Sequence, residues 1–302
     1  MAPRKHPPEG TLRLHRRFRS HALKNSRDVV VWLPPGYGKT RQRHPVVYFQ
    51  DGQNIFDART AFLGNAWHAG RTAAELIRAG EIAAPIMVGV YNTGPARIHE
   101  YTPTRAEFPD WADEKTVLRS RGEAKRYARF VVNEIKPFID SHYLTLPGRR
   151  HTAVVGSSMG GLAALYFALW HPRTFGLVGA LSPSIWWDSP VVVRDFSALR
   201  KKPGIRLWLD MGTAEPGWEA VQQLRDALVA RGWKVGDDLH YAEVAGADHS
   251  EKAWAKRTGP LLKFFLGREK PAARKVATSP RKRAMPATKS GLLKRGADVD
   301  IW

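Results

Sequence analysis

The feature that most constrains this chain is the segment 156–160, whose sequence is Gly-Ser-Ser-Met-Gly. An apolar, β-prone run (151–155) leads into it, and a run of helix-forming composition (162–170) follows it. The segment fits the pattern G-x-S-x-G with Ser158 at its centre, which sets a serine on a tight turn between a strand and a helix. Such a turn is strained, so the positions two before and two after the serine must lack bulk. The segment therefore predicts a nucleophile-bearing turn at Ser158.

The rest of the chain alternates between strand-like and helix-like segments. Strands are expected at 28–33, 45–50, 85–91, 177–181, 205–210 and 239–244, and helices at 67–79, 123–143, 191–199, 218–230 and 251–266. This alternation predicts an α/β fold, in which a doubly wound, mostly parallel sheet carries helices on both faces.

Two segments in the middle of the chain have unusual features. Residues 92–122 are polar and aromatic with little periodicity, and a loop of this length inside a compact domain is usually functional. The helix expected at 123–143 contains Pro137, which should kink it or split it.

Positive charge is concentrated at the two ends of the chain. Of the net charge of +20, residues 1–27 carry +7 and residues 268–302 carry +7. We expect three parts: a basic, partly disordered N-terminal segment (1–27) with an edge strand at 11–18, a catalytic domain (28–267), and a disordered basic tail (268–302). The basic ends could bind nucleic acid or another polyanion, or they could simply be solvated termini.

Composition narrows the remaining classes of protein. No apolar run approaches the roughly 20 residues that a membrane-spanning helix needs. The first eight residues have no apolar core after their charges, so no secretory signal is expected. The chain has no cysteine, which excludes disulfides, thiol catalysis and cysteine-based zinc sites. We therefore expect a cytoplasmic protein with no membrane partner.

A serine needs an imidazole to accept its proton before it can act as a nucleophile. Three histidines follow Ser158 in the sequence. His171 ends the helix that follows the serine and is expected to cap it, while His240 falls inside an expected strand. His249 lies in a loop of small residues after the last strand, at the edge of the sheet where doubly wound proteins place their sites. We therefore predict His249 as the base.

The candidate acids are Asp188, Asp210, Glu215 and Asp248. Glu215 follows the strand expected at 205–210, again at a carboxyl end, whereas Asp210 is still within that strand and is expected to be buried. Asp248 is adjacent to the histidine, and neighbours in an extended loop point away from each other. Glu215 is the preferred acid, with the alternative that its charge serves the start of the following helix.

An oxyanion hole needs two backbone N–H groups directed at the developing negative charge. One is expected from Met159, the residue after the nucleophile. The other is expected from the loop 51–54, which follows the strand at 45–50. Gly52 allows a sharp turn there, and either Gly52 or Gln53 could donate, with Gln53 preferred.

Several spaced motifs occur along the chain: 48–56 (YFQDGQNIF), 89–92 (GVYN) with Arg97, Glu100, Tyr101 and Pro103, 130–140 (FVVNEIKPFID), 156–161 (GSSMGG), 181–187 (LSPSIWW), 212–215 (GTAE) and 249–254 (HSEKAW). In these motifs the chain resembles the esterase branch of the α/β-hydrolases, which includes enterochelin-esterase-like and feruloyl-esterase-like enzymes and is related to S-formylglutathione hydrolase and the mycolyltransferases. The resemblance spans about residues 28–267.

The resemblance implies Ser158 as nucleophile, Glu215 as acid and His249 as base. It also implies that several further residues surround the mouth of a substrate pocket together with Gly52, namely Arg97, Glu100, Tyr101, Trp186 and Trp187. The two tryptophans could hold an aromatic or sugar-bearing acyl group, or could cover the end of the sheet.

The sequence thus predicts a serine hydrolase that cleaves a small-molecule carboxylic ester through an acyl-enzyme, with no metal or organic cofactor. Within that class, cleavage of a siderophore lactone is the alternative to simple acyl-ester hydrolysis. Two further alternatives come from other classes: a hydrolase fold that only binds, and a protein that binds polyanions through its basic ends.

Overall fold

The computed structural model describes residues 9–109 and 117–268. The chain divides into two units, Met1–Arg268 and Glu269–Trp302. The described residues include neither the second unit nor residues 1–8. The disorder expected of the tail therefore stays a prediction. The fold below is that of the first unit.

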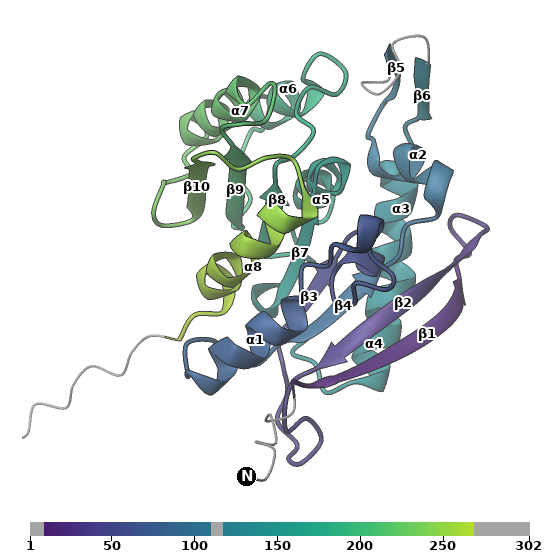
Figure 1. Ribbon diagram of the computed structural model, residues 1–302. Coiled ribbons are helices and arrows are strands. Elements are labelled where there is room, and N and C mark those ends of the chain that lie inside the picture. Colours follow the sequence, from purple (N-terminus) through teal and green to yellow (C-terminus); the bar gives the residue numbers. More distant parts are fainter. Residues whose placement is uncertain (1–8, 110–116, 269–302) are drawn as a thin grey trace, which may run out of the picture. The chain divides into compact units, whose positions relative to one another are not determined.

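An eight-stranded sheet forms the centre of this unit (Figure 1). The first two strands of the chain, β1 (Thr11–Arg19) and β2 (Ser26–Leu33), pair antiparallel. β2 also pairs antiparallel with β4 (Ile86–Val90), and all other neighbouring strands of this sheet pair parallel. The predicted α/β class with a mostly parallel sheet is confirmed. In spatial order the strands are β1 (Thr11–Arg19), β2 (Ser26–Leu33), β4 (Ile86–Val90), β3 (Val46–Phe49), β7 (Thr152–Ser157), β8 (Leu177–Leu181), β9 (Arg206–Gly212) and β10 (Leu239–Val244).

The edge strand β1 lies before residue 28, where the sequence analysis placed the start of the domain. Its residues are mostly exposed, and it pairs with β2 through a register shift between His15 and Phe18. The sheet therefore includes part of the basic N-terminal segment.

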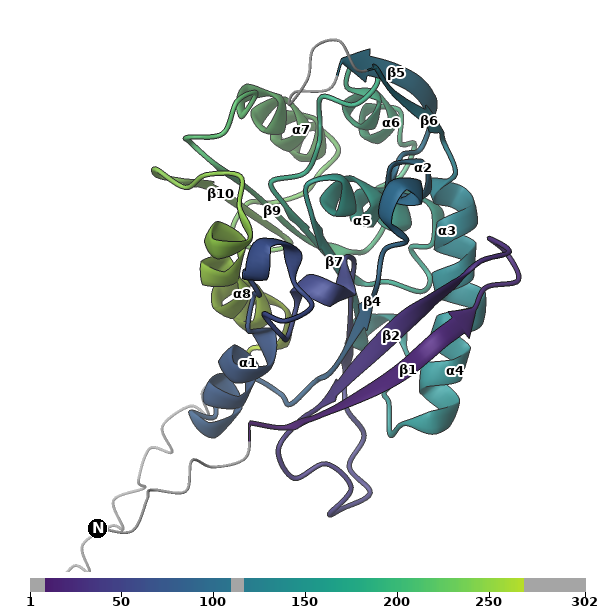
Figure 2. The ribbon, with the colours of Figure 1, turned by 45° about the vertical axis from the view of Figure 1, so that its right-hand side comes forward.

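Helices cover both faces of the sheet, as Figures 1 and 2 show. Because β3 and β7 are buried along their whole length, each face needs an apolar layer, and the structure has one apolar cluster on each side. One face carries α1 (Ala69–Arg78) and α8 (Glu251–Leu266), which contact each other. The other carries α3 (Ala124–Phe130), α4 (Lys136–His142), α5 (Met159–Trp170), α6 (Val191–Ser197) and α7 (Glu219–Ala230).

The segment expected to be a long loop contains regular structure. It holds a short helix α2 (Arg97–Tyr101) and a two-stranded hairpin of β5 (Arg105–Pro109) and β6 (Val117–Arg121). The break expected at Pro137 takes the form of a π-helical segment, Val131–Ile135, between α3 and α4. Pro137 lies just after this segment as the second residue of α4.

The turn after β7 is the most constrained point of the backbone. Ser158 has φ 55° and ψ −126°, a backbone conformation that residues other than glycine rarely adopt. The chain folds back so tightly that a Cβ added to Gly156 would lie 2.3 Å from the carbonyl oxygen of Gly160. The turn therefore requires glycine at position 156 for steric reasons.

We predict that Gly156→Ala lowers the free energy of unfolding by about 1 to 3 kcal/mol, because the added methyl group meets backbone that cannot move aside. Gly148→Ala is the matched control, since nothing lies within 4 Å of a Cβ there and its φ is negative. That control should change stability by less than about 0.5 kcal/mol. Urea denaturation measures both, and equal stabilities would contradict the steric argument.

Candidate active site

Three polar side chains meet at the carboxyl edge of the sheet. Ser158 follows β7, Glu215 follows β9, and His249 follows β10. These strands are parallel, so the loops that follow them lie at the same edge. Topology alone therefore brings together residues separated by up to 91 positions in the sequence.

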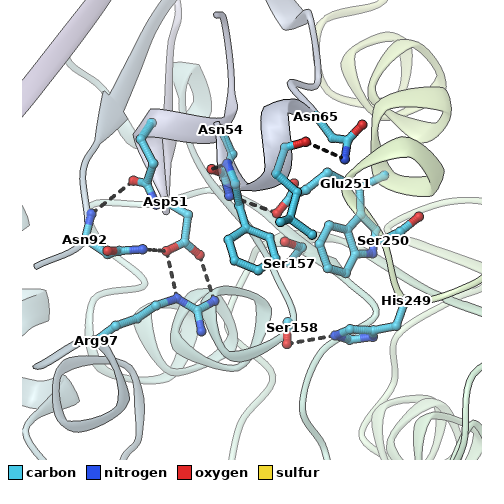
Figure 3. A pocket seen from close by; sticks show the side chains of 14 residues that line it. Asp51, Asn54, Asn65, Asn92, Arg97, Ser157, Ser158, His249, Ser250 and Glu251 are labelled. Carbon is cyan, nitrogen blue, oxygen red and sulfur yellow. Dashed lines mark hydrogen bonds and ion pairs between the residues drawn. The ribbon is translucent and has the colours of Figure 1, made fainter. Parts of the chain in front are cut away.

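His249 lies between the other two. Its Nε2 is 2.9 Å from Ser158 Oγ, a contact drawn in Figure 3, and its Nδ1 is 2.6 Å from Glu215 Oε2. The ring packs edge-on against Trp254, with centroids 4.9 Å apart. Each imidazole nitrogen thus has one partner, which holds the ring in a single orientation.

The other candidates from the sequence have other partners. His240 stacks on the ring of Trp208 at 3.6 Å, and the backbone N–H of His171 donates to the last turn of α5. The carboxylate of Asp248 accepts a hydrogen bond from Ser250 Oγ at 2.6 Å. Asp188 lies in the turn before α6. Among the described candidates, the histidine–carboxylate hydrogen bond belongs to Glu215.

Glu215 is buried and well supplied with donors. Its Oε1 accepts hydrogen bonds from Ser182 Oγ at 2.6 Å and from the backbone N–H of Gly212 at 2.8 Å. Burial raises the pKa of this carboxyl, but the hydrogen bonds from His249, Ser182 and Gly212 outweigh it, and the pKa ends below its usual value. The group is therefore ionised at neutral pH.

A second buried layer lies beneath Glu215. Arg257 of α8 donates from Nη1 to Asp210 Oδ1 at 2.5 Å and to Ser182 Oγ at 3.2 Å, and its Nη2 is 3.8 Å from Glu215 Oε1. Burial raises the pKa of Asp210 to about 6 against the opposing effect of Arg257. Asp210 is thus buried, as expected. Arg257 and Ser182 were not among the residues predicted for the site, although Ser182 directly follows β8 and could have been found from that position.

The loop after β3 forms another wall of the site around Ser158. It contains a short 3₁₀ helix, η1 (Gly52–Asn54), preceded by Asp51 at φ 52°. A Cβ on Gly52 would lie 2.2 Å from the carbonyl carbon of Gly89, so glycine is needed there for close approach to β4. Gln53 and Met159 both lie in the first turn of a helix, where backbone N–H groups have no intrahelical acceptor.

Arg97 faces this loop from α2. It donates from Nε and Nη2 to the two carboxylate oxygens of Asp51, both at 2.8 Å, and Asn92 donates to the same carboxylate at 2.7 Å (Figure 3). Tyr101 supports the pair from below, because its ring lies under Arg97 and its hydroxyl accepts from the Asp51 N–H. The charge of Arg97 is thus paired.

Two cavities flank Ser158 and His249. The first, of about 440 Å³, is lined mainly by polar residues, which include Asp51, Asn92 and Arg97, and also by the exposed apolar side chains of Phe62 and Leu63. We call it the polar cavity after these residues. The second, of about 370 Å³, is lined by Trp186, Met211 and prolines together with serines. Ser158 and His249 border both cavities.

Several residues expected at the pocket mouth lie elsewhere. Glu100 is buried and forms an ion pair at 2.7 Å with Arg27. Tyr101 is fully buried under Arg97, and Trp187 is fully buried with its Nε1 donating to Thr104 Oγ1. These three are interior residues whose polar atoms are satisfied by the protein, whereas Trp186 and Arg97 do line the cavities.

Comparison with known proteins assigns the family. Residues 20–262 match the model of the family described as "Putative esterase". The chain belongs to this family. The resemblance drawn from the sequence motifs is thereby confirmed, and this esterase is a carboxylic ester hydrolase.

The esterase is similar to named relatives and to a solved structure. It is 25% identical to the uncharacterized protein YbbA of Bacillus subtilis, over 81% of this chain and 94% of that protein. It is 28% identical to an iron(III) enterobactin esterase of Escherichia coli O6:H1, over 78% of this chain but only 53% of the relative. The enterobactin esterase FES of Shigella flexneri shares the fold, with a TM-score of 0.66 and 21% identity over 86% of this chain and 60% of the other. The esterase thus spans little more than half the length of the two enterobactin esterases.

Within the described part of the esterase, no group of three or more His, Asp and Glu side chains is placed to hold a metal ion. No helix in that part is both long enough and apolar enough to cross a membrane.

We predict that Glu100→Ala in this esterase lowers the free energy of unfolding by about 3 to 5 kcal/mol, because it leaves the buried Arg27 charge unpaired. The control is Glu107→Ala, which breaks the exposed ion pair with Arg119 and should cost less than about 1 kcal/mol. Urea denaturation compares them. A Glu100 variant as stable as the control would return Glu100 to the list of possible substrate contacts.

Proposed function

We propose that this esterase cleaves a small-molecule carboxylic ester through an acyl-enzyme on Ser158. In the first step Ser158 Oγ bonds to the ester carbonyl carbon while its proton passes to His249 Nε2. Glu215 accepts a hydrogen bond from His249 Nδ1, which keeps the imidazole in the tautomer that can take this proton, and stabilises the imidazolium that forms.

The negative charge on the carbonyl oxygen is stabilised by the backbone N–H groups of Met159 and Gln53. The intermediate then collapses, and the alcohol leaves with the proton from His249. A water molecule gives a proton to the same nitrogen and attacks the acyl carbon. The bond from that carbon to Ser158 Oγ then breaks, His249 returns the proton to Oγ, and the carboxylic acid is released.

One observation carries this proposal: a single imidazole lies within hydrogen-bond distance of both the serine and a buried carboxylate. A fold that only binds would have no need for this arrangement, so the non-catalytic alternative is disfavoured. The strained conformation of Ser158 supports the same conclusion, since strain of this kind is typical of functional turns.

For the substrate, we propose an ester that joins an apolar group, held beside Trp186, to a group rich in hydrogen-bonding atoms, held beside Asn92 and Arg97. The names of the relatives favour a siderophore lactone as the second candidate. A comparison of p-nitrophenyl esters of rising chain length with feruloyl and catecholate esters distinguishes these candidates.

A cytoplasmic location and polyanion binding by the basic ends remain expectations. Residues 1–8 and 269–302 lie outside the described part of the chain. Binding to duplex DNA that weakens steeply with salt, and is lost on removal of 268–302, would support a polyanion partner. Binding that is absent, or insensitive to salt, would dismiss it.

We predict that a fluorophosphonate probe labels the native protein at Ser158 and that Ser158→Ala abolishes labelling. Ser184→Ala is the matched control, because Ser184 Oγ lies only 3.4 Å from Ser158 Oγ and this variant should still be labelled. Mass spectrometry of the labelled peptide gives the modified residue. A folded wild-type protein that takes up no label would overturn the enzymatic proposal.

We predict that Glu215→Gln lowers kcat by roughly 10³- to 10⁴-fold, since the amide can no longer fix the imidazole tautomer. Asp248→Asn should keep activity within a few-fold, because that residue is exposed and its carboxylate accepts a hydrogen bond from Ser250. Steady-state kinetics on variants shown to be folded by circular dichroism provides the measurement. The reverse order would make Asp248 the acid.

A further inference from the structure

A carboxylate that the mechanism does not use lies beside the nucleophile. Glu251 is the first residue of α8, two positions after His249, and it lines the polar cavity together with Ser158. Its side chain is half-buried and points across the cavity to the loop that follows β3 (Figure 3).

Both oxygens of Glu251 are bound by that loop. Oε1 accepts a hydrogen bond from Asn54 Nδ2 at 2.8 Å, and Oε2 accepts one from Trp67 Nε1. These donors mark the two ends of the segment 54–67, and they are themselves joined by a hydrogen bond of 2.8 Å from the Trp67 N–H to the Asn54 carbonyl. One carboxylate from α8 therefore holds both ends of a fourteen-residue loop.

Asn54 transmits this constraint in two directions. Its side-chain oxygen accepts a hydrogen bond from the N–H of Phe62 at 3.0 Å, so the amide is fixed between Phe62 on one side and Glu251 on the other. Phe62 belongs to the rim of the cavity, and Asn54 directly follows Gln53, the proposed oxyanion donor. Oxyanion donors act only when held within about 0.5 Å of their productive position.

We propose that Glu251 is a positioning residue of this esterase, whose ionised carboxylate ties the Gln53–Asn54 loop to the helix that follows His249. It thereby fixes the oxyanion donor relative to the catalytic base. This inference rests on the proposed function, because it needs Gln53 to be an oxyanion donor.

Ionisation matters because both partners of Glu251 are donors. A carboxylate accepts from both, whereas the neutral acid carries a proton that faces donors only. Among the described residues, the charges that act on Glu251 are those of Asp51 and Arg97 across the cavity; His249 lies in the preceding loop, and the exposed Lys252 is next in the helix. Burial raises the pKa of Glu251 to about 7, with Asp51 adding to the rise and Trp67, Arg97 and Asn54 opposing it.

The protonation state of Glu251 determines how strongly it holds the loop. Below about pH 7 the folded protein carries the neutral acid, and the hydrogen bonds from Asn54 and Trp67 are weaker. Above it the carboxylate forms and accepts both as charge-assisted hydrogen bonds, although its burial makes ionisation cost folding stability. Glu251→Gln imitates the neutral form at every pH. Any loss of activity in this variant should therefore be large at high pH and small at low pH.

The first test compares Glu251→Gln with wild type in steady-state hydrolysis of a p-nitrophenyl ester between pH 5.5 and 9. We expect kcat to fall about 10- to 100-fold at pH 8.5 with a smaller change in KM, because a displaced oxyanion donor affects the transition state more than binding. The ratio of wild-type to variant kcat should approach one below pH 6.

The matched control is Glu219→Gln, an exposed carboxylate at the equivalent first position of α7. It removes a charge from a helix start without touching the site and should leave the ratio at one throughout. A Glu251 variant with wild-type kcat at pH 8.5, or with a loss that is the same at all pH values, would overturn the proposal.

A second measurement follows the hydrogen bond itself. The indole ¹H–¹⁵N resonance of Trp67, identified by its absence in Trp67→Phe, should shift with a midpoint near pH 7 in wild type and stay constant in Glu251→Gln. A resonance that does not titrate in wild type contradicts the inference even if the variant fails to fold. Failure of the esterase proposal is recognised separately, because wild type would then take up no fluorophosphonate.

Discussion

The site depends on a backbone turn in which a serine is held at positive φ. This conformation costs of order 1–3 kcal/mol and persists only where the surroundings fix it. Here the Ser158 N–H donates to the carbonyl of Leu181 in the neighbouring strand, and its carbonyl accepts from Ser184. The glycines on either side let β7 and α5 approach closely. The turn is thus held by the central strands of the sheet, and it projects the hydroxyl beyond their edge.

Local patterns in the sequence were sufficient for the fold class and for most strands and helices. The sequence also predicted that Ser158, Glu215 and His249 lie close together, because each follows a parallel strand and such loops share an edge; the structure brings their side chains into hydrogen-bond contact. The contacts that support them were not predictable. Arg257 reaches Asp210 across 47 residues and Glu251 reaches Asn54 across 197, and nothing in the local sequence encodes such pairings.

The same limit explains the residues placed wrongly at the pocket mouth. Glu100 and Trp187 are of residue types that are common in binding sites, and they lie in motifs of the family. Both are buried, and their polar atoms are bound by Arg27, 73 residues away, and by Thr104, 83 residues away. In the polar cavity, the charges of Asp51 and Arg97 neutralise each other.

One helix carries much of the site. Along one side of α8, Glu251 contacts the loop after β3, Trp254 packs on the imidazole of His249, and Arg257 supports the buried acids. Its far end is fastened to the chain before β4, where Ala83 N–H donates to the carbonyl of Leu266. A small rigid movement of α8 would therefore carry these supports together and keep their mutual spacing. Detachment of α8 would remove them all at once, so local unfolding of this helix should switch the enzyme off without a partially active intermediate.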